Sequence, residues 1–419
     1  MRRRGRMLTG AAVVALFAGV LLAAPSGTMP LRGRVIDAHT NAPIADAYVT
    51  IGETVGRTDR DGVFAIDGTG VVRARAVGYG RVDVGPVPDA AITVALPSLR
   101  PKALYASFYG IGSSHLRETM LALAERTEIN ALVIDVKGDQ GKIPYASDVP
   151  LAVEVGAQTP RTIADVDALV TRLHARGLYL IARIVVFKDR PLAVARPALA
   201  VKTRNGGVWL DREHLPWTDP FRREVWDYNI DVAVEAARHG FDEIQFDYVR
   251  FPDATGLAYA EASTQESRTA AIGGFLVEAR RRLVPYNVFL SADVFGYVCW
   301  NLNDTMIGQR IEDLAPLLDY VSPMLYPSSF QFGIPGYRNP VAHPYEIVFL
   351  SLEQARQRSG LPATRFRPWL QAFRDYAFDR RPFGGDEIRT EISAAEAFGS
   401  DGWMLWNPRN TYSVDGLAR

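Results

Sequence analysis

Cysteine is almost absent from this chain of 419 residues, because Cys299 is the only one. An intrachain disulfide and a cage of metal-binding thiolates are therefore excluded. Histidine is also scarce, and none of the six histidines stands at the HxxH or HExxH spacing of a zinc hydrolase. The sequence predicts no metal and no other cofactor.

The chain also lacks an excess of charge of either sign. Lys and Arg total 47 and Asp and Glu total 47, so no basic field attracts nucleic acid. A hydrophobic content of 48% and a charged content of 22% are typical of a globular protein and not of a disordered one. A chain of this length accommodates one large domain and one small domain.

The N-terminus contains a hydrophobic run. MRRRGRM is followed by LTGAAVVALFAGVLLAAPSG, residues 8–27. Positive charge ahead of an apolar segment is typical of an export signal or an N-terminal anchor. Roughly 17 to 20 apolar residues is close to the minimum that spans a bilayer, and Leu22 disfavours cleavage after Ala24 because a small residue is preferred there. We expect residues 1–28 to direct export, to the periplasm or the outside, either as a cleaved signal peptide or as a retained membrane anchor.

Residues 31–97 have the pattern of a small all-β domain. Apolar and polar residues alternate in LRGRVIDAHTNAPIADAYVTI around a turn at Asn41–Pro43, and RTDRDGVFAIDG adds an Asp-Gly turn. Short strands at close spacing predict an antiparallel sandwich. Through GRVID (33–37), PI (43–44), AYV (47–49) and TDRDGVF (58–64), the segment resembles the carboxypeptidase regulatory-like domain. The resemblance implies a spacer or adhesive unit.

Residues 102–419 follow a proline-containing linker and alternate between apolar runs and helical patterns. In TIADVDALVTRLHARG, for example, the apolar residues share one helical face ahead of Gly177. Strands buried on both faces and separated by helices predict a parallel sheet. Eight such repeats predict an α/β fold, the (β/α)8 TIM barrel; a doubly wound sheet is the alternative, but no glycine-rich turn follows the first strand. The predicted strands span 103–109, 131–138, 178–188, 241–251, 288–296, 320–327, 366–373 and 402–408.

Polar residues occur inside several of these predicted strands. Side chains two residues apart share one face of a strand, and the active sites of such barrels lie at the carboxyl ends of the strands. In EIQFDYVRFPD (243–253), alternation turns Gln245, Asp247 and Val249 toward the barrel interior. Applied to strands two and five, it directs further polar residues inward: Asp135, Lys137 and Asp293.

Each of the acids also has a purely structural interpretation. Asp135 and Lys137 could form an internal ion pair, Asp247 could pair with Arg250, and Asp293 could bond to neighbouring backbone. Buried carboxylates are costly unless they are paired or take part in chemistry. The position of Asp247 at the end of strand four favours a function for it.

Five motifs carry a resemblance that covers the large domain. VIDVKG, QFDYVRFP, SADVFGY, SPMLYPS and MLWNP together resemble a bacterial glycoside hydrolase family with a TIM-barrel catalytic domain. The resemblance implies hydrolysis of a glycan. Gln245-Phe246-Asp247 is more distantly similar to the Arg-x-Asp of amylase-like barrels, in which this Asp is the nucleophile. The chain departs from that pattern, because Gln245 replaces Arg, Asp293 replaces Glu, and strand seven lacks a His-Asp pair.

Glycosidic cleavage requires two carboxyl groups, one protonated and one ionised. Neighbouring strand ends can hold such groups roughly 5 to 9 Å apart. We therefore predict Asp247 as the nucleophile or base and Asp293 as the general acid, with Asp135 able to replace either. The side chains predicted to bind the saccharide present aromatic faces or polar edges near the strand ends: Lys137, Gln245, Arg250, Tyr326, Gln371, Trp406 and Trp209.

The expected function is that of an exported hydrolase of a polysaccharide or cell-envelope glycan. Its expected partner is a polysaccharide or oligosaccharide, with the membrane added if the N-terminal segment is retained. A barrel that binds glycan without cleaving it, in envelope assembly or adhesion, is the alternative, because strand five offers no Glu. Deacetylation is a third possibility, and it normally requires a metal cluster that the sequence does not provide.

Overall fold

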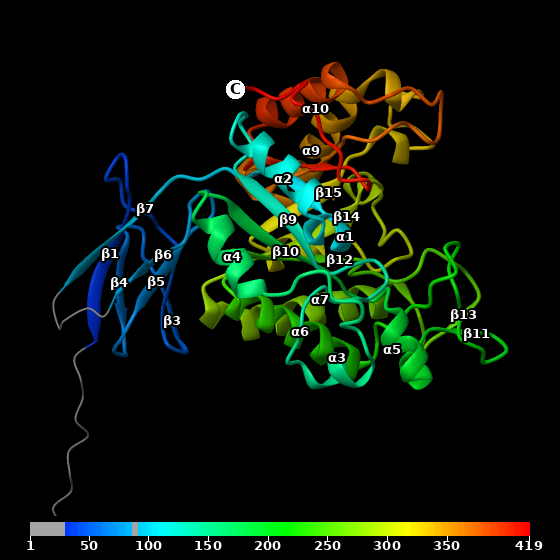
Figure 1. Cartoon of the computed structure of the whole chain (residues 1–419), viewed down its shortest axis with the longest axis horizontal. Coiled ribbons are helices and arrows are strands. Elements are labelled where there is room, and N and C mark those ends of the chain that lie inside the picture. Colours follow the sequence, from blue (N-terminus) through cyan, green and yellow to red (C-terminus); the bar gives the residue numbers. More distant parts are fainter. Residues whose placement is uncertain (1–29, 86–90) are drawn as a thin grey trace, which may run out of the picture.

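Two units, each with its own hydrophobic core, make up the computed structural model, which describes residues 30–85 and 91–419 (Figure 1). A small β-sandwich comes first and a large barrel follows it. The predicted signal or anchor, residues 1–28, lies outside the described residues. Within the described ranges, no helix is long and apolar enough to cross a membrane.

The small unit consists of two sheets with strand orders β4-β1-β7 and β3-β2-β5-β6. Val35 and Phe64 of the first sheet share a core with Val49 and Val72 of the second, which confirms an all-β unit. The predicted purely antiparallel pairing is wrong in one place, because β1 runs parallel to β7. Only strands joined by a tight hairpin must be antiparallel, and these two are far apart in sequence. The strands are β1 (Leu31–Asp37), β2 (Tyr48–Ile51), β3 (Thr54–Arg57), β4 (Val63–Ile66), β5 (Val72–Arg75), β6 (Val82–Val84) and β7 (Ile92–Leu96). Its resemblance to a carboxypeptidase regulatory-like domain stays a prediction.

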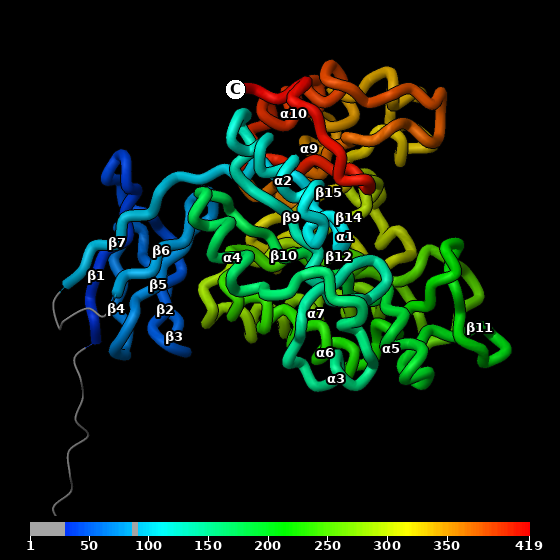
Figure 2. Tube along the Cα trace, viewed as in Figure 1, coloured from blue at the N-terminus to red at the C-terminus, as the bar shows by residue number. Residues whose placement is uncertain are grey.

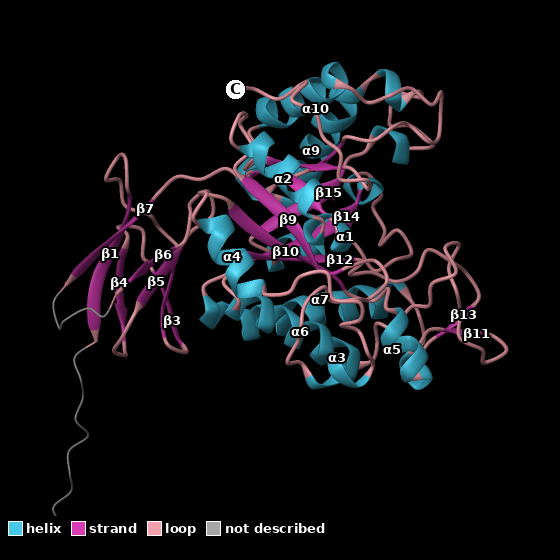
Figure 3. Ribbon diagram, in the orientation of Figure 1, coloured by secondary structure: helices cyan, strands magenta, loops and turns pink. Residues whose placement is uncertain are grey.

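The large unit is a closed barrel of eight parallel strands in the order β10-β12-β14-β15-β16-β17-β8-β9. This confirms the predicted (β/α)8 fold, and every predicted strand overlaps an observed one. Figure 3 shows the barrel strands at the centre of this unit with helices around them. The barrel strands are β8 (Lys102–Ala106), β9 (Ala131–Lys137), β10 (Tyr179–Val185), β12 (Glu243–Asp247), β14 (Phe289–Phe295), β15 (Tyr320–Met324), β16 (Trp369–Gln371) and β17 (Trp403–Trp406).

The helices bury their apolar faces against the outward-facing side chains of the strands. Leu180, Ile244 and Phe246 point outward into this layer, where Phe275 of α7 packs edge-on against Phe246. The α4 helix ends ahead of Gly177, whose φ of 74° is the left-handed conformation that the sequence predicted there. The helices are α1 (Phe108–Gly112), α2 (Ser114–Ala124), α3 (Pro150–Glu154), α4 (Val166–His174), α5 (Arg190–Ala195), α6 (Arg223–Arg238), α7 (Gln265–Leu283), α8 (Ile311–Leu314), α9 (Pro344–Ser359) and α10 (Gly385–Phe398). A short pair, β11 (Lys202–Thr203) and β13 (Leu257–Ala258), lies in the loops.

The sandwich is fixed to the amino-terminal face of the barrel, beside which it lies in the trace of Figure 2. The backbone N–H of Gly78 donates to the Tyr320 hydroxyl (3.0 Å), and Arg81 Nε donates to Asp242 (2.8 Å). Tyr320 begins β15 and Asp242 precedes β12, so these contacts identify the face at which the strands start. The opposite face, where active sites of this fold lie, is formed by the loops that follow the strands.

Candidate active site

The amino-terminal half of the barrel interior is filled with side chains. Its apolar members form one cluster, beside which the fully buried Glu243 pairs with Arg367 (2.6 Å), so this part of the barrel is a packed core and not a channel. The cluster is Ala103, Tyr105, Ala131, Val133, Tyr179, Ile181, Phe289, Tyr320, Trp369 and Met404. Val133 of β9 and Phe289 of β14 share the parity of Asp135 and Asp293, which the sequence assigned to the interior.

Toward the carboxyl ends of the strands, the interior becomes polar around Arg183 of β10. Its guanidinium donates to Asp135 (2.6 Å), to Asp139 (2.8 Å) and, through Nε and Nη2, to Asp247 (3.0 and 2.6 Å). Arg183 is only 1% exposed. Burial opposes its charge, but the carboxylates of Asp139, Asp247 and Asp135 raise its pKa well above the ordinary value, so it stays protonated. In the described part of the chain, it is the only cation bonded to these three acids.

The Asp135 carboxylate accepts hydrogen bonds from three groups. The Tyr105 hydroxyl (2.8 Å) and the backbone N–H of Phe108 (3.1 Å) donate to Oδ2, while Arg183 holds Oδ1. Burial raises the pKa of Asp135, and the charge of Arg183 opposes that shift. A Cβ on Gly138 would lie 3.2 Å from Asp135 Oδ2, which explains why a glycine suits this turn.

Asp247 and Asp293 are neighbours on adjacent strands. The register pairs Phe246 with Ala292, so the next residue of each strand, Asp247 and Asp293, stands at the same level. Asp247 Oδ1 accepts from the backbone N–H of Tyr248 (2.5 Å), and Oδ2 accepts from Arg183, so both of its oxygens receive donors. Tyr248 has a φ of 47°, an uncommon left-handed conformation that ends the strand directly after Asp247.

Asp293 has a very different environment. Trp369 Nε1 donates to Oδ1 (2.7 Å), and no side chain or backbone group within residues 30–85 and 91–419 bonds to Oδ2. Burial, followed by the charge of Asp247, raises the pKa of Asp293 well above the ordinary value of an aspartate. The carboxyl is 1% exposed and Asp247 is 5% exposed. The raised pKa favours the protonated form of Asp293, whereas Asp247 beside it is paired with Arg183.

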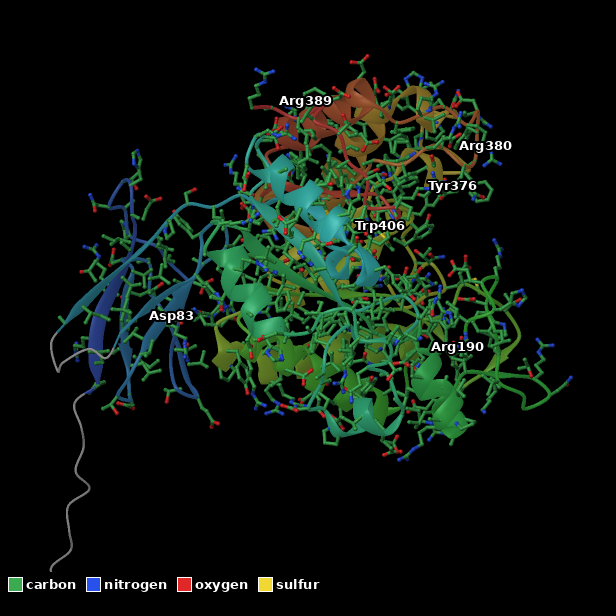
Figure 4. The ribbon with its side chains drawn as sticks, in the orientation of Figure 1. Asp83, Arg190, Tyr376, Arg380, Arg389 and Trp406 are labelled. Carbon is green, nitrogen blue, oxygen red and sulfur yellow. The ribbon has the colours of Figure 1, made fainter. Side chains whose placement is uncertain are left out.

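Aromatic side chains surround the acids. The Trp406 ring stacks on Tyr105 (3.8 Å between centroids) and lies 4.9 Å from the Arg183 guanidinium. Tyr326 packs against the interior cluster, and burial together with the charges of Asp293 and Asp247 raises its pKa. The Phe373 ring packs edge-on against Tyr326 (5.4 Å between centroids). Figure 4 shows Trp406 on the side of the barrel away from the sandwich.

Two hollows open beside these residues. A smaller one of about 210 Å³ is lined by Tyr105, Asp135, Asp139 and Trp406. A larger one of about 550 Å³ is lined by residues from the loops after β10 and β12, among them the predicted Trp209 and Arg250. Within the described ranges, no group of three or more His, Cys, Asp or Glu side chains is arranged to hold a metal ion.

Two sequence-based placements, those of Lys137 and Val249, are wrong, and two alternative ion pairs, Asp135–Lys137 and Asp247–Arg250, do not form. The register skips Val136, since Arg183 pairs with Asp135 but Ile184 pairs with Lys137, and this bulge directs Lys137 away from Asp135. Lys137 Nζ is fully buried and pairs with Asp189 (2.7 Å), so neither the predicted ion pair with Asp135 nor a place in either hollow exists.

The other two outcomes depend on the end of β12. Asp247 pairs with Arg183 and not with Arg250, whose guanidinium lies 5.0 Å from the Trp217 ring. Val249 belongs to the outer core and does not face the interior, because the backbone turns at Tyr248 and the alternation stops there.

The two predicted glutamines are buried and bonded to protein. Gln245 Nε2 donates to Ser322 Oγ (3.3 Å) and to Met404 Sδ (3.4 Å). Gln371 receives the Ser328 N–H (3.0 Å) and donates to Ser328 Oγ (2.8 Å). Gln371 therefore fixes the loop after β15, the loop that carries Tyr326.

Sequence reasoning missed Asp139 and the role of Tyr105. Asp139 has a side chain that is 41% exposed and follows β9 in a loop, so no alternation pattern indicates where it points. Tyr105 stands on the inward face of β8, and that position was the available signal for its contact with Asp135.

Comparison with known proteins shows which family the large unit matches and which solved structures it resembles. A family model described as "Putative glycosyl hydrolase domain" matches residues 103–412. A hypothetical protein from Ruminiclostridium thermocellum is 41% identical, over 46% of this chain and 97% of that chain, with a TM-score of 0.41. The PgaB (BpsB) glycoside hydrolase domain from Bordetella bronchiseptica is 13% identical, over 74% of this chain and 95% of its own, with a TM-score of 0.54, and thus shares the fold. No curated protein sequence matches the chain.

Proposed function

Because the chain belongs to the family described as "Putative glycosyl hydrolase domain", we propose that it is an exported hydrolase of a polysaccharide or cell-envelope glycan. Export rests on the sequence pattern of residues 1–28. The reaction is cleavage of a glycosidic bond by water, with one carboxyl group as proton donor and a second, ionised, on the other side of the bond.

The observation that carries this proposal is the contrast between two adjacent acids. Asp293 has a raised pKa and an Oδ2 without a partner among the described groups, which suits a general acid that protonates the leaving oxygen. Asp247 is held by Arg183 and a backbone N–H, which suits an ionised nucleophile or base. Environments that push two neighbouring carboxyls toward opposite protonation states are those of a glycosidase pair.

The placement of the pair is compatible with such a mechanism. Neighbouring strands lie about 4.8 Å apart, but Asp247 is drawn toward Arg183 of β10 and Asp293 toward Trp369 of β16, on opposite sides. Retaining and inverting mechanisms together require carboxyl groups about 5 to 9.5 Å apart.

Asp135 takes a different role in this proposal. With Asp139 it keeps Arg183 in place, and both acids line the smaller hollow with Trp406. The face of Trp406 offers a surface for the apolar side of a pyranose ring, while the carboxylates accept hydrogen bonds from its hydroxyl groups. Asp135 thus positions the cation and contacts the sugar, and Asp247 and Asp293 carry out the chemistry.

The low exposure of Asp293 favours one competing function, a barrel that binds glycan without cleaving it. Both functions predict binding, but only the hydrolase generates new reducing ends.

The test is release of reducing ends from a panel of bacterial polysaccharides by the wild type, Asp247→Asn and Asp293→Asn. We expect each variant to lose at least about 100-fold in rate, the low end for loss of an acid or base. Asp313→Asn, which changes a surface acid paired with Arg310, is the matched control and keeps full activity. Glycan binding without any product from the wild type would favour the binding-only function, and full activity of both variants would refute the assigned roles.

A further inference from the structure

A second cavity lies on the far side of the barrel, between the sandwich and the amino-terminal face. It has a volume of about 590 Å³ and contains no residue of the candidate active site. Four arginines line it, two from the sandwich and two from the barrel, against two aspartates: Arg57, Arg75, Arg280, Arg365, Asp46 and Asp319. Four cations and two anions leave a formal charge of +2 in a partly enclosed space.

Arg75 of β5 is the most deeply buried of these side chains, at 2% exposure. Its guanidinium has five N–H donors, yet within the described residues it makes a single hydrogen bond, from Nη1 to Asp319 (3.1 Å). Its Nε is buried and has no partner there. A buried, charged donor without an acceptor is costly, so Arg75 retains donors that the described groups do not satisfy.

The two arginines of the barrel are also hydrogen-bond donors and need acceptors of their own. Arg280 donates from Nη1 to Asp319 (3.1 Å), so Asp319 is shared by two guanidinium groups. Arg365 donates to the carbonyls of Leu318 and Asp319 and makes no ion pair in the described part of the chain. Burial lowers the pKa of Arg75 and of Arg365, and the positive charge of Arg280 adds to both effects. Two cations thus share one carboxylate, and the third, Arg365, bonds only to backbone carbonyls.

We propose that this cavity is a binding site for a phosphate group, held by Arg75, Arg280 and Arg365 with Arg57 at its edge. A phosphate monoester carries a charge of about −1.5 to −2 at neutral pH and three acceptor oxygens, which matches the formal charge of the cavity. Guanidinium groups bind such oxygens in pairs of parallel hydrogen bonds. Because the arginines come from both units, a bound phosphate would also strengthen the contact between sandwich and barrel.

The experiment is calorimetric titration of the full-length protein with inorganic phosphate, with chloride at equal ionic strength as the reference. We expect saturable 1:1 binding, at least tenfold weaker in Arg365→Gln and unchanged in Arg356→Gln, a control whose arginine pairs with Glu353 on the exposed face of α9. Arg57→Gln, which removes a half-exposed side chain and leaves the buried pairs intact, repeats the test if Arg365→Gln does not fold.

Glycerol 3-phosphate distinguishes the two sources of the group. Binding of both compounds indicates a phosphate carried on a larger molecule, and binding of inorganic phosphate alone indicates the free ion; either result supports the site. Two results would overturn the proposed site. One is a heat of phosphate addition no greater than that of chloride. The other is equal phosphate affinity in wild type, Arg365→Gln and Arg57→Gln.

Discussion

Replacing Asp293 with asparagine should make the protein more stable at neutral pH while abolishing its activity. The asparagine oxygen can accept the Trp369 Nε1 hydrogen bond that the carboxyl accepts at 2.7 Å, so the substitution keeps the shape and the bond. What it removes is an ionisable group that burial and the nearby charge of Asp247 hold in its protonated form. An acid that is kept protonated for catalysis is a cost to the folded state.

The size and sign of this effect follow from proton linkage. The raised pKa means that the folded chain keeps a proton at Asp293 that the unfolded chain has lost, so wild-type stability falls as the pH rises from the unfolded pKa, about 3.9, through the folded one. The loss is about 1.4 kcal/mol for each pH unit in that window. Asp293→Asn has no such loss, and its advantage over the wild type therefore grows with pH at that rate until the wild-type carboxyl ionises. The raised pKa of Asp135 affects both proteins and cancels in the difference.

Denaturant unfolding followed by tryptophan fluorescence measures this difference directly. All seven tryptophans lie beyond residue 200, so the signal reports the barrel alone. We compare wild type, Asp293→Asn and the surface control Asp313→Asn at each pH unit from 4 to 8. The difference in the free energy of unfolding between the control and the wild type should not change with pH. A difference in the free energy of unfolding that does not change with pH, or an Asn variant less stable than the wild type at pH 7, would show that Asp293 is ionised in the folded protein.

Two further substitutions test the contacts around the site. Arg183→Met leaves Asp135 and Asp247 buried without their cation. The free energy of unfolding should therefore fall by about 3–5 kcal/mol at pH 7 and by less at pH 4. A loss below about 1 kcal/mol at pH 7 would contradict the pairing. Although burial opposes the shift, hydrogen bonds from the Ser328 hydroxyl and from loop backbone N–H groups lower the pKa of Asp375 to about 2. A carboxyl whose pKa is lower in the folded chain stabilises the fold at pH values above its unfolded pKa. Asp375→Asn should therefore lower the free energy of unfolding by about 2 kcal/mol at pH 7, and by progressively less as the pH falls from 4 to 2. An equal loss at pH 7 and pH 3 in denaturant titrations would exclude an ionised Asp375 as the source.

The fold was accessible from the sequence because strand and helix periodicities are local properties. Alternation along EIQFD put Gln245 and Asp247 in the interior, and the structure places both there. The same rule failed at Lys137, where the bulge in β9 shifts the alternation by one residue, and at Val249, where the left-handed backbone of Tyr248 ends it.

The contacts inside the site were less accessible, because they depend on which strands are neighbours. Three acids from two strands and one loop converge on Arg183, and only the closed order of the barrel brings them together. Asp139 lies in a loop, so its contact with Arg183 depends on the conformation of that turn and not on any repeating pattern. The roles of Asp247 and Asp293 as base and acid were predicted from strand position, and they await experiment.

A crystal structure of Asp247→Asn with an oligosaccharide from the glycan it binds would test the proposed chemistry at the atomic level. We expect a glycosidic oxygen within about 2.6–3.2 Å of the Asp293 carboxyl, the reach of a general acid, with a sugar ring against Trp406. A saccharide confined to the hollow around Trp209, with Asp293 out of reach of every glycosidic oxygen, would contradict the mechanism.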